Sequence, residues 1–324
     1  MYDVVALGEL LIDFACISND SEGYPTLAAH PGGAPANFLA AINKFGGKTA
    51  LLGKVGNDTF GKLLLGTLEK SGIDSKGIVC TDDVFTTLAF VTFDASGDRE
   101  FSFSRKPGAD TQLGFEDVDL SMIDKTKVFH FGTLSLTDEP VREATKKTVE
   151  YAKSKNKLIT FDPNLRKPLW SNLTSAREQI LWGMSKADVV KISDDEVEFL
   201  FGLTPEQGAK HILENYDTKL VFVTCGADGC VYANKNTYGF VPSLKGLNVI
   251  DTCGAGDIFG GSAIWKILRF EKEPELLNHE ELKEVVQFAC VAAGLSTEKS
   301  GGISSIPDYT DVIERMRLNE LLDT

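Results

Sequence analysis

The sequence predicts an α/β protein built on a parallel sheet, with a small β flap inserted into it. Short apolar runs, such as residues 4–8 and 220–224, are typical of strands buried on both faces. Helical patterns alternate with such runs from residue 128 onward, and a hairpin pattern between residues 86 and 105 interrupts the alternation. At 324 residues the chain is long enough for one large domain or two small ones.

The first predicted strand covers residues 4–8, and its apolar run continues to residue 14. Asp13 is a single carboxylate inside this run. It has two interpretations: a charge that protects an edge strand from aggregation, or an acceptor for sugar hydroxyl groups. The sequence leaves both open.

A helix is expected after Gly32-Gly33, because Pro35 suits its first turn and Gly46 suits the position just beyond its end. The paired glycines would let a ligand approach the backbone, and Asn37 could point at that ligand. A plain loop with a polar first turn is the alternative.

A second strand and helix are expected between residues 55 and 72, with Asp58 as the N-cap and Gly72 just past the end. The hairpin follows, with arms at residues 86–93 and 99–105 around a turn at residues 94–98. Phe101 and Phe103 alternate with serines, which indicates one apolar face.

Strands are then expected near residues 128–132, 158–161, 188–192 and 220–224, with a helix near 141–155. Ser193 and Glu196 match a capping box, and Glu196 near a magnesium ion is a second, compatible interpretation. The turn at residues 225–229 follows a buried strand, where open α/β sheets bind ligands.

The stretch Asp251-Thr252-Cys253-Gly254-Ala255-Gly256-Asp257 leads into a helical pattern at residues 258–269, and a second helix is expected at 280–297. Small residues at a helix start leave backbone N–H groups open to an anion. Asp257 beside them suits phosphoryl transfer, in which amides stabilise charge and a carboxylate takes the proton of the attacking hydroxyl. An ordinary acidic first turn remains the alternative.

The net charge of −14 disfavours nucleic acid and anionic membranes as partners. The six cysteines are scattered without a C-x-x-C pair, which favours free thiols in a reducing cytosol. The sequence has neither a signal peptide nor an apolar run long enough to span a bilayer, so we expect a cytoplasmic protein.

These stretches together resemble the ribokinase-like (PfkB) sugar kinases, and among them the fructokinases, over nearly the whole chain. The resemblance is carried by six motifs in the family's order: Gly8-Glu9-Leu10-Leu11-Ile12-Asp13, Gly32-Gly33-Ala34-Pro35-Ala36-Asn37, Gly53-Lys54-Val55-Gly56-Asn57-Asp58, Arg105-Lys106-Pro107-Gly108-Ala109-Asp110, Phe161-Asp162-Pro163-Asn164-Leu165-Arg166 and residues 251–257. It implies one ribokinase-like domain over residues 1–324, with a mostly parallel sheet, helices on both faces and a β lid from about residues 11–33 and 86–105.

The resemblance also assigns roles to individual residues. The base would be Asp257, with an anion hole from the amides of Gly254, Ala255 and Gly256. Contacts to the sugar would come from Asp13, Gly32, Gly33, Asn37, Arg105, Asn164 and Arg166, the last two near the transferred phosphate. The nucleotide and Mg²⁺ would be served by Lys191, Glu196, Thr224, Gly226 and Gly229 together with Gly254 and Gly256. A monovalent cation, K⁺ in the simplest case, would bind at Asp251, Thr252, Gly302 and Ser304.

The chain departs from the family pattern at three positions: Ser193 where asparagine is usual, Cys253 in the anion-hole loop, and Cys290 where many relatives have asparagine beside the adenine. The reaction implied is transfer of the γ-phosphoryl group of ATP to the C6 hydroxyl of D-fructose. The alternatives are a 2-keto-3-deoxygluconate kinase, a ribokinase and a non-catalytic sugar-binding regulator. A carboxylated sugar would need an arginine aimed at its acid group, and Arg105 could supply it. The apolar face of Phe101 and Phe103 has two interpretations: it pairs two lids in a homodimer, or it closes over the sugar.

Overall fold

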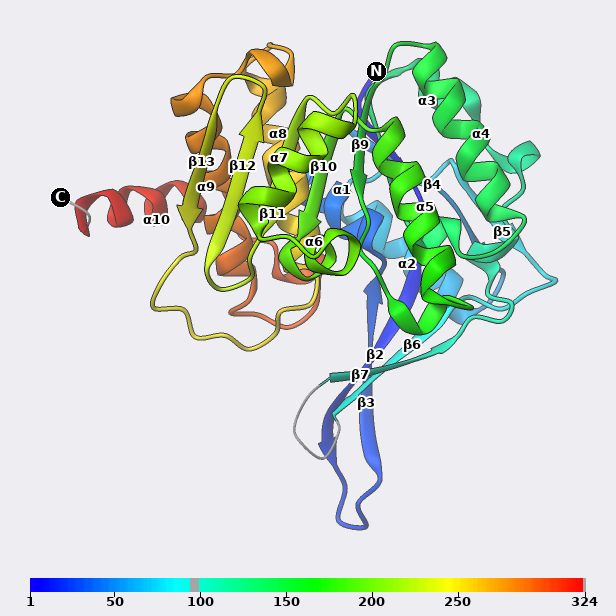
Figure 1. Cartoon of the computed structure of the whole chain (residues 1–324). Helices are drawn as coiled ribbons and strands as arrows, with labels where there is room; N and C mark the ends of the chain where they lie inside the picture. Colours follow the sequence, from blue (N-terminus) through cyan, green and yellow to red (C-terminus); the bar gives the residue numbers. More distant parts are fainter. Residues whose placement is uncertain (94–98, 323–324) are drawn as a thin grey trace.

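The computed structural model describes residues 1–93 and 99–322, with side chains described for residues 1–91 and 102–318. In this part of the chain nine strands form a central sheet in the order β13-β12-β11-β10-β9-β8-β1-β4-β5 (Figure 1). The strands are β1 (Tyr2–Leu7), β4 (Thr49–Gly56), β5 (Ile78–Thr81), β8 (Thr126–Gly132), β9 (Leu158–Asp162), β10 (Val189–Ser193), β11 (Leu220–Thr224), β12 (Gly229–Asn234) and β13 (Tyr238–Pro242).

The central sheet is parallel from β5 through β11, and only β12 and β13 run antiparallel at one edge. Each apolar run predicted as a buried strand forms a strand of this sheet. Because the neighbours are parallel, their carboxyl ends share one edge, and the loops that leave them meet there.

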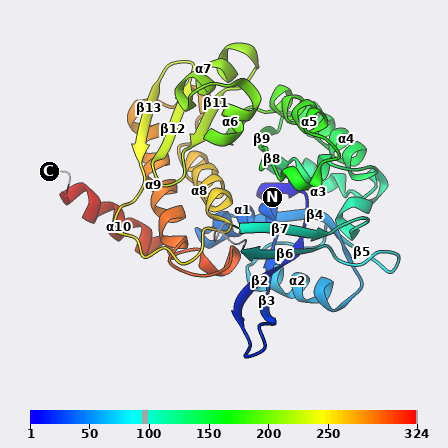
Figure 2. The ribbon, with the colours of Figure 1, turned by 60° about the horizontal axis from the view of Figure 1, so that its bottom comes forward.

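Helices cover both faces of the sheet (Figures 1 and 2). They are α1 (Ala34–Lys44), α2 (Thr59–Lys70), α3 (Leu120–Asp124), α4 (Val141–Ser154), α5 (Leu173–Lys186), α6 (Asp194–Phe201), α7 (Pro205–Asn215), α8 (Ala255–Arg269), α9 (His279–Ser296) and α10 (Tyr309–Leu322). Side chains alternate along a strand. Val4 and Ala6 of β1 therefore pack into the core with α1, α8 and α9, whereas Val5 and Leu7 pack into the core with α4, α5 and α7.

Four strands form a second sheet, in the order β3-β2-β6-β7, which extends below the central sheet in Figure 1. They are β2 (Leu11–Asn19), β3 (Pro25–Gly32), β6 (Leu88–Phe93) and β7 (Arg99–Ser104). The chain therefore leaves the central sheet after Leu7, although the apolar run continues. The predicted turn at residues 94–98 and the side chain of Phe101 lie outside the described part of the chain.

The edge-strand interpretation of Asp13 is wrong. Asp13 lies on β2, which pairs with β3 on one side and with β6 on the other, so β2 is an inner strand of the second sheet. A carboxylate there cannot protect an open sheet edge. Its burial needs another explanation.

Helix ends agree with the predicted signals. The side chain of Asp58 accepts hydrogen bonds from the N–H groups of Phe60 and Gly61 at the start of α2. Gly46 and Gly72 follow the ends of α1 and α2 with φ values of 89° and 73°, which suit glycine. The capping box of Ser193 is present at α6. Within the described chain, no helix has the length and apolar character needed to cross a bilayer.

Candidate active site

Asp257 lies in the first turn of α8, where three segments that are distant in the sequence meet. The side-chain amide of Asn37, from α1, donates to Oδ2 of Asp257 at 3.0 Å. The amide of Asn164, from the loop after β9, donates to Oδ1 at 3.1 Å. Each carboxylate oxygen therefore has one neutral donor, which fixes the orientation of the side chain without neutralising its charge.

The environment of Asp257 raises the pKa of its carboxyl group towards neutral pH. Burial raises the pKa of Asp257 to about 6, and the charge of Asp162 adds to the increase, while Asn37, Lys191 and Arg166 oppose it. A carboxylate with a pKa near 6 is ionised at neutral pH and is more basic than an ordinary aspartate. This is a suitable condition for a general base.

The start of α8 exposes main-chain donors beside Asp257. Within the described residues, the N–H groups of Gly254 and Gly256 have no protein acceptor, whereas that of Ala255 donates to the carbonyl of Thr252 at 3.3 Å. Two of the three predicted anion-hole amides are therefore open, and the third is engaged in a long turn bond. The positive end of the dipole of this 15-residue helix reinforces them.

Gly254 is required by its geometry. Its φ is 76°, and a Cβ atom there would lie 3.0 Å from Cα of Gly302 and 3.1 Å from Nδ2 of Asn37. A larger residue would push the helix start away from Asn37, the residue that orients Asp257.

A cavity of about 220 Å³ opens between the second sheet and the starts of α1 and α8. This is smaller than the roughly 300–1,000 Å³ of pockets for drug-sized ligands, so it suits a small molecule. The residues that were predicted from the sequence and that line this cavity are Asp13, Gly33, Asn37, Asn164, Arg166, Lys191, Thr252, Gly254, Gly256, Asp257 and Gly302. Glu9, Leu11, Ala34, Phe103, Leu134 and Cys253 complete the lining.

The functional interpretation of Asp13 is consistent with this geometry. Burial raises the pKa of Asp13 to about 6, the charge of Arg166 opposes the shift, and Asp257 adds to it. Gly32 has no room for a side chain, because a Cβ atom would overlap Oδ2 of Asp13. Gly33 has a φ of 118°, and a Cβ atom there would overlap the carbonyl oxygen of Glu9. Gly33 therefore keeps this wall of the cavity open, whereas Gly32 does not line the cavity and leaves room for the carboxylate of Asp13.

A larger cavity of about 830 Å³ adjoins the first and shares Asn164, Arg166 and Lys191 with it. Nζ of Lys191 forms an ion pair with Asp162 at 2.8 Å. Glu196 accepts from the N–H groups of Leu165 at 2.7 Å and Ser193 at 2.9 Å. The Ser193 that replaces the usual asparagine thus caps α6, and its hydroxyl accepts from the N–H of Glu196 at 3.2 Å.

The predicted nucleotide residues Thr224, Gly226 and Gly229 lie at the end of β11 and in the turn to β12. The Thr224 hydroxyl donates to the carbonyl of Ile192 at 3.4 Å, and Gly226 and Gly229 have φ values of 52° and 137°. None of the three lines either cavity. They lie at the same carboxyl edge of the sheet as the other site residues.

The predicted cation residues come from two loops that the structure brings together. Oδ1 of Asp251 accepts from the N–H of Cys253 at 2.9 Å, and Oδ2 accepts from the N–H of Gly301 at 3.0 Å. The hydroxyl of Ser304 donates to the carbonyl of Ser300 at 3.0 Å, within its own loop. Oxygen atoms of carboxylates and main-chain carbonyls are the kind of ligand that hard cations prefer.

Arg105 is not among the residues that line the cavity, although a contact with the sugar was predicted for it. Its guanidinium group is buried and bonded to Asp110, Thr137 and the carbonyl of Leu134. Arg105 directly follows β7 of the second sheet, and the direction of its side chain could not be read from the sequence.

Two carboxylates that sequence reasoning did not select are part of the site. Asp162 pairs with Lys191, and its position directly after a buried strand was the signal that could have identified it. Glu9 lines the cavity, and its Oε1 accepts from the N–H of Ala34 at 2.9 Å. Burial raises the pKa of Glu9 to about 7.

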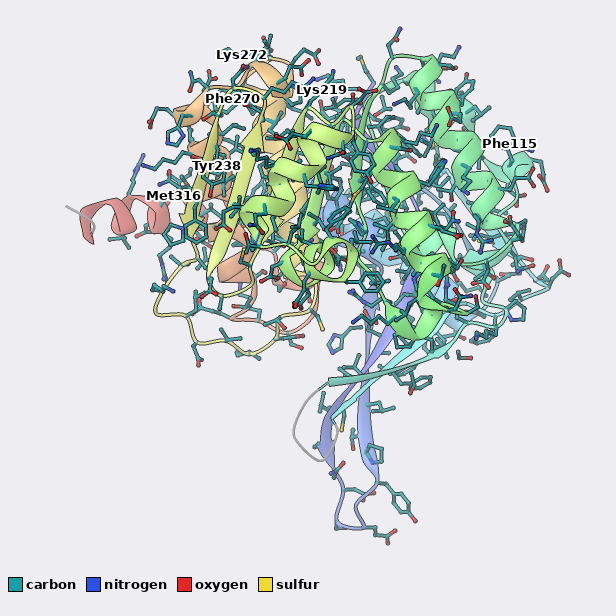
Figure 3. The ribbon with its side chains drawn as sticks, in the orientation of Figure 1. Phe115, Lys219, Tyr238, Phe270, Lys272 and Met316 are labelled. Carbon is teal, nitrogen blue, oxygen red and sulfur yellow. The ribbon has the colours of Figure 1, made fainter. Side chains whose placement is uncertain are left out.

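Another cavity, of about 510 Å³, lies at the opposite edge of the central sheet, among Lys127, Lys219, Lys272 and their neighbours. Lys219 and Lys272 are seen at the top of Figure 3, far from the second sheet. Both are ion-paired, Lys219 with Glu273 and Lys272 with Glu281. This cavity shares no residue with the site around Asp257.

The fold and the site define a kinase of small hydroxylated molecules. The carboxylate can take the proton of the attacking hydroxyl, and the open amides can stabilise charge on the transferred phosphoryl group. The chain belongs to a known family of such enzymes. The model of that family, pfkB family carbohydrate kinase, matches residues 1–309.

Named relatives are similar over almost the full length of the chain. A probable fructokinase-2 of Arabidopsis thaliana is 40% identical over 319 residues, covering 97% of this chain and 96% of the relative. A fructokinase of Xylella fastidiosa with bound ATP has a TM-score of 0.90 at 27% identity, covering 99% of this chain and 100% of that chain. A fructokinase of Vibrio cholerae O395, in its fructose, ADP and calcium ion bound form, has a TM-score of 0.86 at 29% identity, covering 97% and 99%.

Proposed function

We propose that this protein is an ATP-dependent fructokinase that transfers the γ-phosphoryl group of ATP to the C6 hydroxyl of D-fructose, giving fructose 6-phosphate and ADP. The observation that carries the proposal is Asp257, held between Asn37 and Asn164 beside the open amides of Gly254 and Gly256. The names of the relatives supply the sugar. The cavity supports it in size and polarity.

In this mechanism Asp257 accepts the proton of the C6 hydroxyl of fructose, while the oxygen of that hydroxyl attacks the γ-phosphorus in line. The bond from that phosphorus to the oxygen shared with the β-phosphate breaks, and ADP leaves with the electron pair. The proton on Asp257 then passes to solvent. The hydrogen bonds from Asn37 and Asn164 hold the carboxylate in one direction, so little reorganisation is needed.

Charge on the transferred group is stabilised by the amides of Gly254 and Gly256 and by the guanidinium group of Arg166, which lines both cavities. The amide of Ala255 joins them only by giving up its bond to Thr252. Lys191 lies where the two cavities meet and supports the phosphates of ATP as a point charge.

The side chains near the larger cavity suit a magnesium ion that is held mainly by water and by the phosphates of ATP. Among the described residues, no group of three or more His, Cys, Asp or Glu side chains could hold a metal. Mg²⁺ usually keeps several waters and uses one or two carboxylates with substrate phosphates, a role open to Glu196. When bound, Mg²⁺ would neutralise phosphate charge. K⁺ near Asp251, Thr252, Gly302 and Ser304 remains part of the proposal.

The second sheet is proposed to act as a lid of one domain spanning residues 1–324, with the lid from about residues 11–33 and 86–105. Phe103 of β7 and Leu11 of β2 line the cavity, so closure of this sheet would exclude water from the sugar. Pairing of two lids in a homodimer is also proposed.

All six cysteines are free, which supports the expected reducing, cytoplasmic compartment.

A panel of hexoses, pentoses and sugar acids, assayed for ADP release, tests the proposal. Fructose should be preferred. Strong preference for ribose or a keto acid would favour the alternative kinases. The geometry of Arg105 does not favour a keto acid, because its guanidinium group already forms an ion pair with Asp110. Fructose binding in calorimetry without any ATP turnover would favour a non-catalytic regulator.

A further inference from the structure

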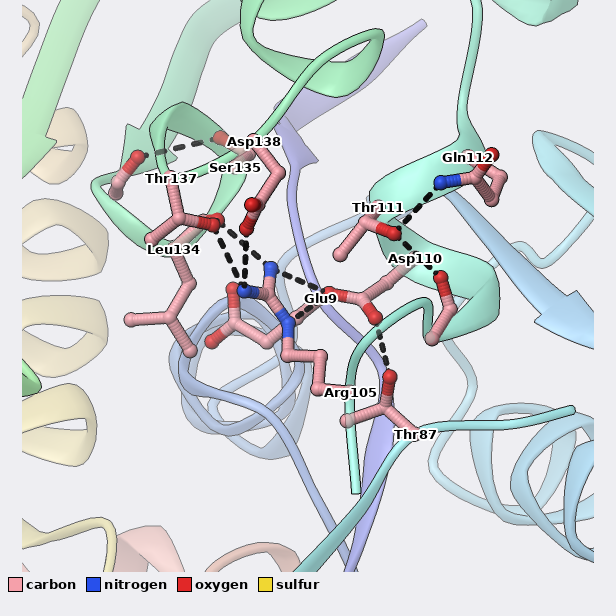
Figure 4. Close-up of polar contacts among 12 residues, drawn as sticks. Glu9, Thr87, Arg105, Asp110, Thr111, Gln112, Leu134, Ser135, Thr137 and Asp138 are labelled. Atoms are coloured by element: carbon pink, nitrogen blue, oxygen red, sulfur yellow. Dashed lines mark hydrogen bonds and ion pairs between the residues drawn. The ribbon is translucent and has the colours of Figure 1, made fainter. Parts of the chain in front are cut away.

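Arg105 is a buried cation that the proposed mechanism does not use. It directly follows β7, and its side chain is only 2% exposed. Nε donates to Oδ2 of Asp110 at 2.8 Å, Nη1 donates to the hydroxyl of Thr137 at 2.7 Å, and Nη2 donates to the carbonyl of Leu134 at 2.8 Å (Figure 4). The planar guanidinium group thus bonds in three directions.

These bonds join two walls of the cavity around Asp257. Phe103 lies two residues before Arg105 on β7 and lines the cavity from the second sheet. Leu134 follows β8 and lines the cavity from the central sheet. The bond from Nη2 to the Leu134 carbonyl therefore connects the strand that carries Phe103 to the loop that carries Leu134.

The partner of Arg105 extends the connection to other strands of the second sheet. The hydroxyl of Thr87, directly before β6, donates to Asp110, and the carbonyl of Thr87 accepts from the N–H of Ile12 on β2 at 3.1 Å. One ion pair therefore lies where β2, β6 and β7 approach the central sheet.

Glu9 links the same cluster to the start of α1. Its carboxylate is buried and interacts electrostatically with the charge of Arg105, and it accepts a hydrogen bond from the N–H of Ala34. The Ala34 amide directly follows Gly33, which lines the cavity.

Stability alone is a weak reason for such a cluster, because the desolvation of a buried ion pair offsets much of its attraction. Geometry is a better reason. Arginine presents donors in a rigid fork, whereas lysine presents one flexible charge, so only arginine can hold Asp110, Thr137 and Leu134 at once.

We infer that Arg105 is a positioning residue for the sugar cavity: it fixes the base of the second sheet to the Leu134 wall and so sets the position of Phe103, without touching the substrate. This inference rests on the proposed function for its kinetic consequence. Its structural consequence can be measured without any reaction.

The kinetic test is Arg105→Lys, which retains the charge beside Asp110 and loses the fork. The KM for fructose should rise about tenfold, as expected for loss of charged hydrogen bonds, while kcat at saturating fructose and the KM for ATP change less than about twofold. The matched control is Lys54→Met. Lys54 forms a partly buried ion pair with Asp117 at 2.8 Å and does not line the cavity. The control should lower Tm without raising the KM for fructose.

The structural test is amide hydrogen exchange of the ligand-free protein. In Arg105→Lys, residues 88–91 and 102–104 should exchange at least about tenfold faster than in the wild type, and in Lys54→Met they should not. The double variant Arg105→Gln/Asp110→Asn removes both charges of the Arg105–Asp110 ion pair and should exchange equally fast.

The outcomes separate the two proposals. Unchanged exchange in both Arg105 variants, or a KM for fructose that rises equally in Lys54→Met, overturns the positioning role. A wild-type protein that does not phosphorylate fructose refutes the proposed function, while faster exchange in the Arg105 variants would still support the structural connection.

Discussion

The side-chain amide of Asn37 donates a hydrogen bond to Oδ2 of Asp257 at 3.0 Å, which joins the first turn of α1 to the first turn of α8. The bond lowers the pKa of Asp257 against the larger effect of burial. It couples the glycine-rich start of α1, which lines the cavity, to the carboxylate proposed as the base.

Replacing Asn37 by alanine should impair catalysis more than folding. Without this donor the pKa of Asp257 rises and its orientation is lost, so kcat should fall roughly tenfold to a hundredfold, below the full effect of losing a base. Steady-state kinetics at pH 7.5 measures this. The control is Asn43→Ala on the same helix, whose amide donates to the carbonyl of Ser71 at 3.0 Å. Equal losses in both variants would contradict a specific role of Asn37.

Activity should fall on the acid side of neutrality. The mechanism needs Asp257 ionised, and its pKa is raised to about 6, so kcat/KM for fructose should be constant above that pH and decrease below it. Asp13 also has a pKa of about 6, which would steepen the decrease. Initial rates between pH 5 and 8 test this, and Asp13→Asn should retain the limb due to Asp257. Activity unchanged down to pH 5 would contradict the assignment.

Gly33→Ala should reduce both stability and fructose affinity. The φ of 118° and the overlap of a Cβ atom with the Glu9 carbonyl together cost on the order of 1–3 kcal/mol. Urea unfolding and the KM for fructose measure the two effects. Gly46→Ala is the matched control, because its φ is 89° and a Cβ atom there meets no atom within 4 Å. A KM that rises as much in Gly46→Ala as in Gly33→Ala would show that the cavity wall is not involved.

Lys191→Met should destabilise the protein by about 3–5 kcal/mol, because it leaves Asp162 buried without its partner. It should also raise the KM for ATP. The double variant Lys191→Met/Asp162→Asn removes the unpaired charge and should recover most of the stability without recovering ATP affinity. If stability and ATP affinity recover together, Lys191 serves the fold and not the nucleotide.

Local signals in the sequence predicted much of the fold. Most of the parallel strands could be recognised because each contains a short apolar run. Asp58 could be recognised as an N-cap because the N–H groups that donate to its side chain lie two and three residues further along the chain. By contrast, β2 continues the apolar run of β1, and nothing local indicates that the chain changes sheets after Leu7.

The site was predictable only in part, for a related reason. Motifs identified Asp257 and Asn37 as candidates, and the fold brings them together. The direction of Arg105 was not predictable, because its partners include Leu134 and Thr137, about thirty residues away in the sequence and on another element. Glu9 was missed because a carboxylate next to an apolar strand has no distinctive pattern.

The most direct test of the account is the turnover of Asp257→Asn with ATP and fructose, measured with protein whose folding is verified by circular dichroism and whose fructose binding is measured by calorimetry. Loss of a general base should lower kcat by roughly 10²–10⁴-fold while fructose still binds. A folded Asp257→Asn protein that phosphorylates fructose at nearly the wild-type rate would contradict the assignment of Asp257 as the base.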